Sequence, residues 1–128
     1  LALQAKGVER SLLVTDAAAP ANCLPGPYVL GGVDVELKDD GRVVLRGGTR
    51  LAGSALRMDH AISNVMLRAG VSLAVAVTMA TTNPARVGRI GGRLRGLQPG
   101  SRADFVLFRF AERGVEILET YFSGQRVA

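Results

Sequence analysis

Asp16 is the residue whose type and position best suit it for chemistry. It directly follows the run Leu12-Leu13-Val14-Thr15, and residues 11–15 have the unbroken apolar character of a strand buried in a parallel sheet. A carboxylate at the end of such a strand has two interpretations. It caps the turn that begins at Ala17, or it lies at the mouth of an active site and accepts a proton from a metal-activated water. The short pattern alone favours the cap.

The segment Leu51-Ala52-Gly53 is the second candidate, because it comes just before an expected helix. Gly53 lets the backbone approach a ligand closely, and the helix that follows would present free N–H groups. The alternative is an ordinary turn that starts a helix. Spacing alone favours this alternative.

Two residue types that often do chemistry occur once each, as His60 and Cys23. A catalytic metal needs several histidine or carboxylate ligands, so we expect His60, beside Asp59, to be a surface or helix-packing residue. Cys23 has no histidine or lysine near it in the sequence, and we interpret it as incidental. A single cysteine fits a reducing compartment, so we expect a cytoplasmic protein.

Strands are indicated on both sides of a helical middle. Residues 33–37 alternate between apolar and acidic side chains, 38–41 have turn chemistry and 42–46 return, which predicts a hairpin with one wet face. Residues 103–110 and 115–122 predict a second antiparallel pair, followed by a terminal strand stub. We expect the two β-rich segments to share one small sheet that the chain leaves and enters again.

Two helices are predicted between these segments, over residues 55–69 and 72–82. Their apolar side chains recur at helical spacing. Each helix has a serine available as N-cap and a residue that ends it. The first helix has Ser54 as its N-cap candidate and Gly70 at its end. The second has Ser72 as its N-cap candidate and Pro84 at its end.

The composition is that of one small globular domain, with 128 residues, 48% apolar and 21% charged. The net charge is +5, but the densest basic segment, residues 86–96, has no aromatic side chain for base stacking. We interpret it as a solvated loop and expect no nucleic-acid partner. No apolar run reaches the roughly 18 residues that cross a membrane, so we expect no membrane partner.

The start and the first strand suggest that the chain is part of something larger. The opening residues contain neither an initiator methionine nor a signal-peptide pattern. The expected strand at 11–15 requires parallel neighbours on both sides, and the chain supplies none. We therefore expect a homo-oligomer or a strand-exchanged assembly, which would cover the apolar surface.

Five stretches of the chain form a recognisable series, in order and at suitable spacings. They are LLVTDA (12–17), YVLGG (28–32), GTRLAGSALRMD (48–59), MATTNPAR (79–86) and GRLRGLQPGSRADFVLF (92–108). Together they cover nearly the whole chain, and the series resembles the N-acetylglucosamine-6-phosphate deacetylase family of the amidohydrolase superfamily. The combination of LAGS, a helix, NPA and PGSRADFV is fairly specific for this family, although the last element is common to many amidohydrolases.

The resemblance implies an α/β fold class: the C-terminal fragment of a (β/α)8 metal-dependent hydrolase barrel, with part of its small β-sandwich domain. On this mapping, residues 1–27 hold the last barrel strand and its loop, and 28–47 a β-sandwich hairpin. Residues 48–90 form closing barrel helices, and 91–128 form β-sandwich strands.

The resemblance also implies roles for the two candidate segments. Active sites of such barrels lie at the C-terminal ends of the strands, where Asp16 stands. Asp16 would be the general acid/base: it takes a proton from the metal-bound water that attacks the acetamide of N-acetyl-D-glucosamine 6-phosphate, then gives a proton to the leaving amine. The products are glucosamine 6-phosphate and acetate, in amino-sugar catabolism. Leu51, Ala52 and Gly53 would contact this amino-sugar phosphate.

A divalent metal, zinc or similar, is implied in the full-length enzyme. In the family its ligands belong to earlier barrel strands, which this chain lacks, so we expect the chain alone to bind no metal and to be inactive. Arg57 stands where family members often have threonine, and we assign phosphate binding neither to it nor to Arg50. Two alternatives stay open: another amidohydrolase such as an N-acetylgalactosamine-6-phosphate deacetylase, and a non-catalytic β-rich assembly module.

Overall fold

The computed structural model describes residues 2–93, 96–112 and 114–128, and it divides into two compact units. The four-stranded unit is Val14–Ala61, and the mixed unit combines Leu1–Leu13 with Ile62–Ala128. The basic segment 86–96 lies partly outside the described residues, because positions 94 and 95 are not among them. Within the described ranges, no helix is both long and apolar enough to cross a membrane.

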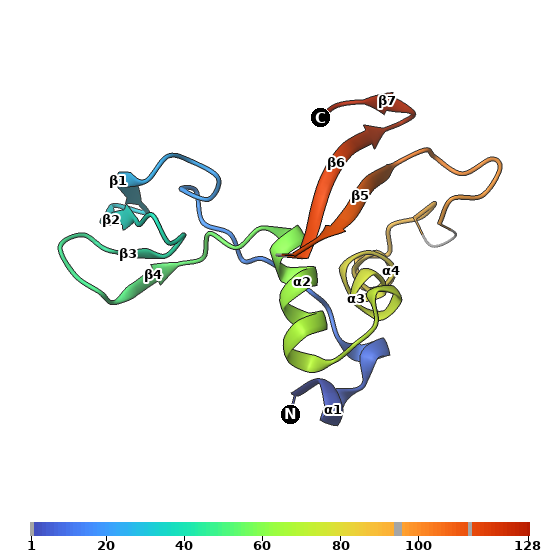
Figure 1. Ribbon diagram of the computed structural model, residues 1–128, viewed down its shortest axis with the longest axis horizontal. Coiled ribbons are helices and arrows are strands. Elements are labelled where there is room, and N and C mark those ends of the chain that lie inside the picture. The colour runs from blue at the N-terminus through green and yellow to red at the C-terminus, as the bar shows by residue number, and fades with distance from the viewer. Residues whose placement is uncertain (1, 94–95, 113) are drawn as a thin grey trace. The chain divides into compact units, whose positions relative to one another are not determined.

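The four-stranded unit is an antiparallel sheet in chain order (Figure 1). Its strands are β1 (Gly26–Leu30), β2 (Val33–Leu37), β3 (Val43–Leu45) and β4 (Leu51–Gly53). β2 and β3 confirm the predicted hairpin, with Val35 facing Leu45. Val35 and Leu37 of the alternating stretch enter the core, against which Tyr28 of β1 packs. Val33, at the start of β2, is 48% exposed.

Strands β1 and β4 lie where no strand was predicted. β1 pairs with β2 over its whole length. β4 pairs with β3 through Val43 opposite Gly53 and Val44 opposite Leu51, with a register shift between the two valines. The segment expected to be a loop or helix start is therefore a short edge strand, anchored by the backbone of the hairpin.

The prediction of a buried strand over residues 11–15 is wrong for this structure. No strand is assigned there, and Leu12 and Val14 are 41% and 64% exposed. The physical reason is the absence of parallel neighbours among the described residues. In their place, the Leu13 amide donates to the Met79 carbonyl at 2.9 Å, and Asn83, only 2% exposed, donates its Nδ2 to the carbonyls of Val8 and Ser11 at 2.8 and 2.9 Å.

Five short helical segments lie among the described residues. They are α1 (Ala2–Lys6), the 3₁₀ helix η1 (Val8–Arg10), α2 (Met58–Ala69), α3 (Leu73–Ala80) and α4 (Thr82–Val87). Two predicted helix boundaries are confirmed. Ser72 caps α3 by accepting from the Val75 amide, and Gly70, with φ +67°, follows the end of α2 and donates its amide to the Met66 carbonyl.

Two other predicted boundaries are wrong. α2 begins at Met58 and not at 55, because the Ser54 hydroxyl bonds elsewhere. Pro84 does not end the second helix; α3 stops at Ala80, and Pro84 lies in the first turn of α4. Proline is tolerated there because the first turn of a helix has no carbonyl partner for its N–H groups.

The sheet of the mixed unit comprises β5 (Phe105–Ala111), β6 (Gly114–Phe122) and β7 (Gln125–Arg126). It confirms the predicted antiparallel pair and the terminal stub, although position 113 of the connection lies outside the described residues. The two β-rich segments do not share one sheet, which corrects the expectation above. Each sheet pairs only strands that follow one another along the chain. Tyr121 stacks on Phe105 with 4.5 Å between ring centroids.

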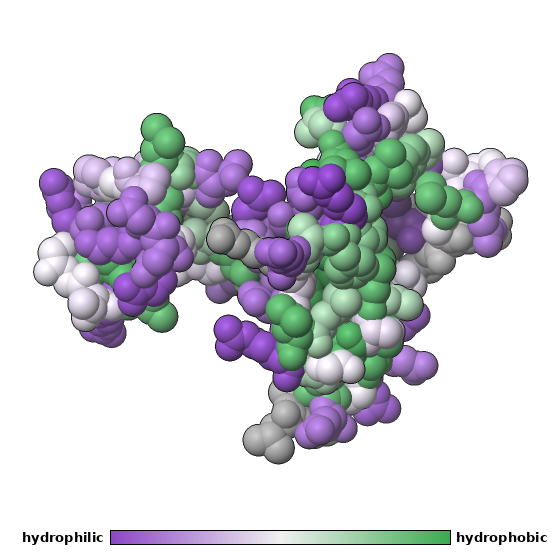
Figure 2. Space-filling view, viewed as in Figure 1, coloured by the Kyte–Doolittle hydropathy of each residue, from purple (hydrophilic) through white to green (hydrophobic). Residues whose placement is uncertain are grey.

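Asp104 fastens the start of β5 to the turn between β6 and β7. Its carboxylate accepts the Ser123 amide at 2.6 Å and pairs with Arg102 at 2.9 Å and with Arg93. The Ser123 hydrogen bond and these two guanidinium groups outweigh desolvation and hold the pKa of Asp104 below its usual range. Figure 2 shows apolar side chains on the surface of this unit. Val106, Leu107 and Phe110 of β5 are among its exposed apolar residues.

Candidate active site

The four-stranded unit brings the two predicted site segments together. Ala17, next to Asp16, forms an isolated parallel bridge with Ser54, which follows Leu51–Gly53. The Ala18 amide donates to the Ser54 carbonyl at 2.8 Å. The Asp16 segment thus runs alongside the end of β4, a proximity that neither local sequence pattern could show.

Asp16 has an unusual backbone conformation and an accessible side chain. Its φ is +51°, in the left-handed region that aspartate tolerates better than most residues but that still carries strain. The residue is exposed. Strained residues of this kind persist where the surrounding chain fixes them, and they occur often at functional sites.

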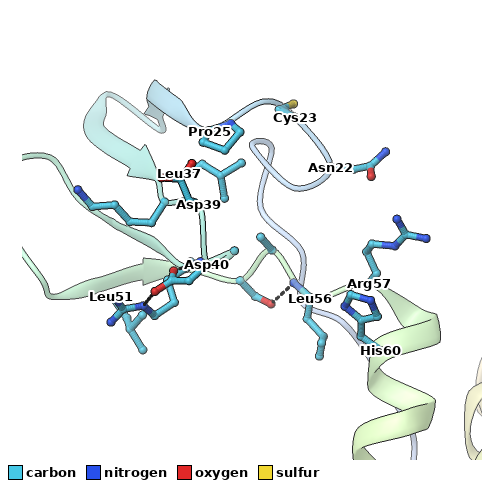
Figure 3. A pocket seen from close by; sticks show the side chains of 16 residues that line it. Asn22, Cys23, Pro25, Leu37, Asp39, Asp40, Leu51, Leu56, Arg57 and His60 are labelled. Carbon is cyan, nitrogen blue, oxygen red and sulfur yellow. Dashed lines mark hydrogen bonds and ion pairs between the residues drawn. The ribbon is translucent and has the colours of Figure 1, made fainter. Parts of the chain in front are cut away.

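Ser54 connects the two segments through its side chain. Its hydroxyl donates to the Thr15 carbonyl at 2.8 Å and accepts the Leu56 amide at 3.1 Å, the bond drawn beside Leu56 in Figure 3. These bonds replace the predicted helix cap. Sequence reasoning missed this role, because no local signal points to a partner 39 positions away.

Gly53 lies close to Ala18 of the other segment. A Cβ placed on Gly53 would lie 3.0 Å from the Ala18 Cβ, and 3.7 Å from side-chain carbons of Leu30 and Val43. Gly53 does not need a positive φ. A side chain at position 53 would therefore press on the chain that carries Asp16.

A pocket of about 650 Å³ lies on the four-stranded unit and includes part of the candidate substrate segment. Leu51 and Gly53 line it, whereas Ala52 packs against the core and Asp16 is not among the lining residues. Leu51 is 65% exposed. The segment thus divides its side chains between the core and an open surface.

Figure 3 shows Arg57 and His60, at the start of α2, across this pocket from the hairpin residues Leu37 and Asp40. Arg57 holds Asp59 through two hydrogen bonds of 3.1 and 2.8 Å. Burial opposes ionisation of Asp59, but the bonds from Arg57 and from the His60 amide hold its pKa below the usual range. His60 itself is exposed, as expected for a surface residue, and so is Cys23 on the rim.

The described residues do not fit a catalytic metal. No group of three or more His, Cys, Asp or Glu side chains in ranges 2–93, 96–112 and 114–128 could hold an ion. A catalytic zinc takes three protein ligands.

Comparison with known proteins decides the family. The model of the amidohydrolase family matches residues 1–127. The chain belongs to the amidohydrolase family. This family is generally metal-dependent, and its members among the relatives below are deacetylases of amino-sugar phosphates.

The amidohydrolase chain is similar to sugar-phosphate deacetylases in both sequence and structure. It is 37% identical to an N-acetylgalactosamine-6-phosphate deacetylase of Escherichia coli O157:H7, over 91% of this chain and 30% of that protein. It is 30% identical to an N-acetylglucosamine-6-phosphate deacetylase of Danio rerio, over 91% of this chain and 28% of that protein.

Two solved structures give the same picture. The N-acetylglucosamine-6-phosphate deacetylase of Thermotoga maritima matches with a TM-score of 0.79 and 30% identity, over 97% of this chain and 32% of that one. The N-acetyl-D-glucosamine-6-phosphate deacetylase of Mycobacterium smegmatis matches with a TM-score of 0.82 and 28% identity, over 98% of this chain and 33% of that one. This amidohydrolase chain thus spans about a third of the length of these relatives.

Proposed function

We propose that this chain supplies the acid/base carboxylate and the substrate-contacting segment of a deacetylase. The proposed substrate is N-acetyl-D-glucosamine 6-phosphate, and the products are glucosamine 6-phosphate and acetate. One observation carries the proposal: the Asp16 segment lies against the end of β4, which supports assigning Asp16 and Leu51–Gly53 to one site.

Asp16 has the chemistry and access that the reaction requires. An exposed carboxylate can accept a proton from the water whose oxygen bonds to the acetyl carbon. When the amide C–N bond breaks, the same carboxyl group returns a proton to the departing nitrogen. Acetate and the free amine result, and Asp16 regains its charge.

Leu51 and Gly53 are suited to hold the sugar. Leu51 offers an exposed apolar side chain, and Gly53 has no side chain between its backbone and a ligand. Ala52 faces the core and fixes the strand. The edge strand β4 would therefore hold the amino sugar through its backbone and one apolar contact.

The divalent metal of the proposed enzyme, zinc or similar, would supply Lewis acidity at the amide carbonyl. The described part of this chain offers no set of ligands for it. We therefore propose that the chain by itself is inactive, and that the other two thirds of a relative would restore activity.

The N-acetylgalactosamine epimer is the second candidate substrate. The 37% identity to the E. coli deacetylase named for that sugar exceeds the 30–32% identity to the vertebrate N-acetylglucosamine enzymes. Both substrates carry the same acetamide, so Asp16 would play one role with either. The ratio of kcat/KM values for the two sugar phosphates distinguishes them.

The deciding experiment measures acetate release from each sugar phosphate, with zinc present. One sample holds the chain alone, and the other adds the N-terminal two thirds of the T. maritima relative. We expect activity only in the second sample, and its loss in Asp16→Asn, which keeps the shape but removes the base. Asp34→Asn, at an exposed aspartate of β2, is the matched control and should retain activity.

Inactivity of every sample, despite folded protein, would favour the non-catalytic β-rich module. Activity of the zinc-loaded chain alone would refute the dependence on missing ligands.

We also propose that exposed Leu12 and Val14 drive self-association, because apolar surface favours burial. Light scattering that shows a monomer at high concentration would contradict this.

A further inference from the structure

Ser54 takes part in three hydrogen bonds, two of which involve residues on either side of Asp16. On the N-terminal side, the Thr15 carbonyl accepts the Ser54 hydroxyl at 2.8 Å. On the C-terminal side, the Ala18 amide donates to the Ser54 carbonyl at 2.8 Å. The Leu56 amide fixes the hydroxyl rotamer by donating to it at 3.1 Å.

The conformation of Asp16 makes such flanking bonds necessary. A residue at φ +51° is in a sparsely populated region, and it relaxes unless the chain on both sides is held. The hydroxyl holds the peptide unit that precedes Asp16, and the carbonyl holds the chain two residues after it. Together they hold the backbone on both sides of Asp16.

We propose that Ser54 is a positioning residue: its hydroxyl holds Asp16 in place against Leu51–Gly53. This inference rests on the proposed function, in which Asp16 carries the proton. A serine is suitable because one hydroxyl donates and accepts at the same time. Threonine keeps both abilities, and alanine loses both.

The effect should fall on turnover and not on substrate binding. β4 keeps its pairing with β3 when the hydroxyl is removed, because those bonds involve only backbone. Leu51–Gly53 therefore stays in place, whereas the Asp16 segment loses its side-chain tether. A catalytic group misplaced by about 1 Å loses on the order of a hundredfold in rate.

The first test uses amide hydrogen exchange in this chain. In Ser54→Ala, the Ala18 amide should exchange roughly tenfold faster or more, the change that follows from about 1.4 kcal/mol of lost protection. The Leu45 amide, which donates to the Arg50 carbonyl at 2.9 Å, should be unchanged and shows that the sheet is intact. Ser54→Thr should resemble the wild type.

The matched control is Ser63→Ala. Ser63 is also a serine whose hydroxyl accepts a distant backbone amide, that of Val115 at 2.9 Å, but it belongs to the mixed unit. The control should leave exchange at Ala18 unchanged. An Ala18 amide that is equally protected in Ser54→Ala and wild type would overturn the proposal.

The second test measures kcat and KM in the sample supplemented with the relative. Ser54→Ala should lower kcat by about a hundredfold with KM within about twofold, Ser54→Thr should recover most of kcat, and Ser63→Ala should match the wild type. Unchanged kcat in Ser54→Ala, or an equal loss in Ser63→Ala, would overturn the role. An inactive wild type would instead refute the proposed function. In that case the exchange rates alone would test whether Ser54 holds the Asp16 segment in place.

Discussion

Replacing Gly53 by alanine should push the Asp16 segment away from β4. The new Cβ would lie 3.0 Å from the Ala18 Cβ, whereas carbon atoms that touch prefer roughly 3.5–4.0 Å. Ala18 must therefore shift by a few tenths of an ångström. The other neighbours, at 3.7 Å, are at ordinary contact distance, so the strain concentrates on Ala18.

The magnitude follows from overpacking. Gly53 is exposed and its added carbon meets one tight neighbour, so we expect a cost of about 1 kcal/mol, at the low end of the range for overpacking. Ala18→Gly alone should cost roughly 0.5–1 kcal/mol, because glycine loses more backbone freedom on folding. If the two effects were independent, the double variant would lose about 1.5–2 kcal/mol. Because Ala18→Gly removes the methyl group that the new Cβ would meet, we expect the double variant to lose only about 1 kcal/mol.

The assay is urea denaturation of the four proteins of this cycle, followed through amide signals of the four-stranded unit. Acetate release in the supplemented sample gives a second readout, in which Gly53→Ala should lower kcat and the added Ala18→Gly should restore it. The reasoning would be refuted if Gly53→Ala were equally destabilising in the wild-type chain and in the chain that carries Ala18→Gly. In that case the steric contact would not explain the glycine.

Three further predictions concern the mixed unit. The pKa of Asp104 is lower in the folded chain than in the unfolded chain. The ionised carboxylate therefore stabilises the fold above about pH 4, and this stabilisation is lost as the pH falls through the pKa of the folded state. Urea midpoints measured across acidic pH should fall less in Asp104→Asn than in the wild type. Asn83→Ala should cost about 1–3 kcal/mol, because the partly buried carbonyls of Val8 and Ser11 lose their donor. Asn83→Asp should cost more, because a carboxylate would face these carbonyls; equal midpoints would contradict this. Ser72→Ala should cost about 0.5–2 kcal/mol in thermal unfolding, with Ser72→Asp close to the wild type.

The local parts of this fold could be predicted because their signals lie within a few residues. The alternation of Val33, Val35 and Leu37 with acidic residues predicted the β2–β3 hairpin, in which a short turn joins two strands that pair with each other. The cap at Ser72 and the stop at Gly70 depend on single side chains and one φ angle. In both cases the partner is a near neighbour in the sequence.

The failures involve partners that are distant in the sequence. Residues 11–15 look like a buried strand, but a strand requires neighbours, and the described chain offers them only single bonds. Ser54 has the right residue type for an N-cap, yet its hydroxyl bonds to Thr15 and not to the helix. The candidate site divides in the same way: resemblance could point to Asp16 and Gly53, but not to Ala18 as the residue that explains the glycine.

The division into two units gives each unit its own natural chromophore. The chain has no tryptophan and two tyrosines. Tyr28 belongs to the four-stranded unit, where its hydroxyl donates to the Leu24 carbonyl at 2.6 Å, and Tyr121 belongs to the mixed unit, where it donates to Glu119 at 2.7 Å. With Tyr121→Phe, all tyrosine emission comes from the unit that carries Asp16, and with Tyr28→Phe it comes from the other. Coincident unfolding curves would make the chain one cooperative body, and separate curves would make the candidate site an independently folding piece.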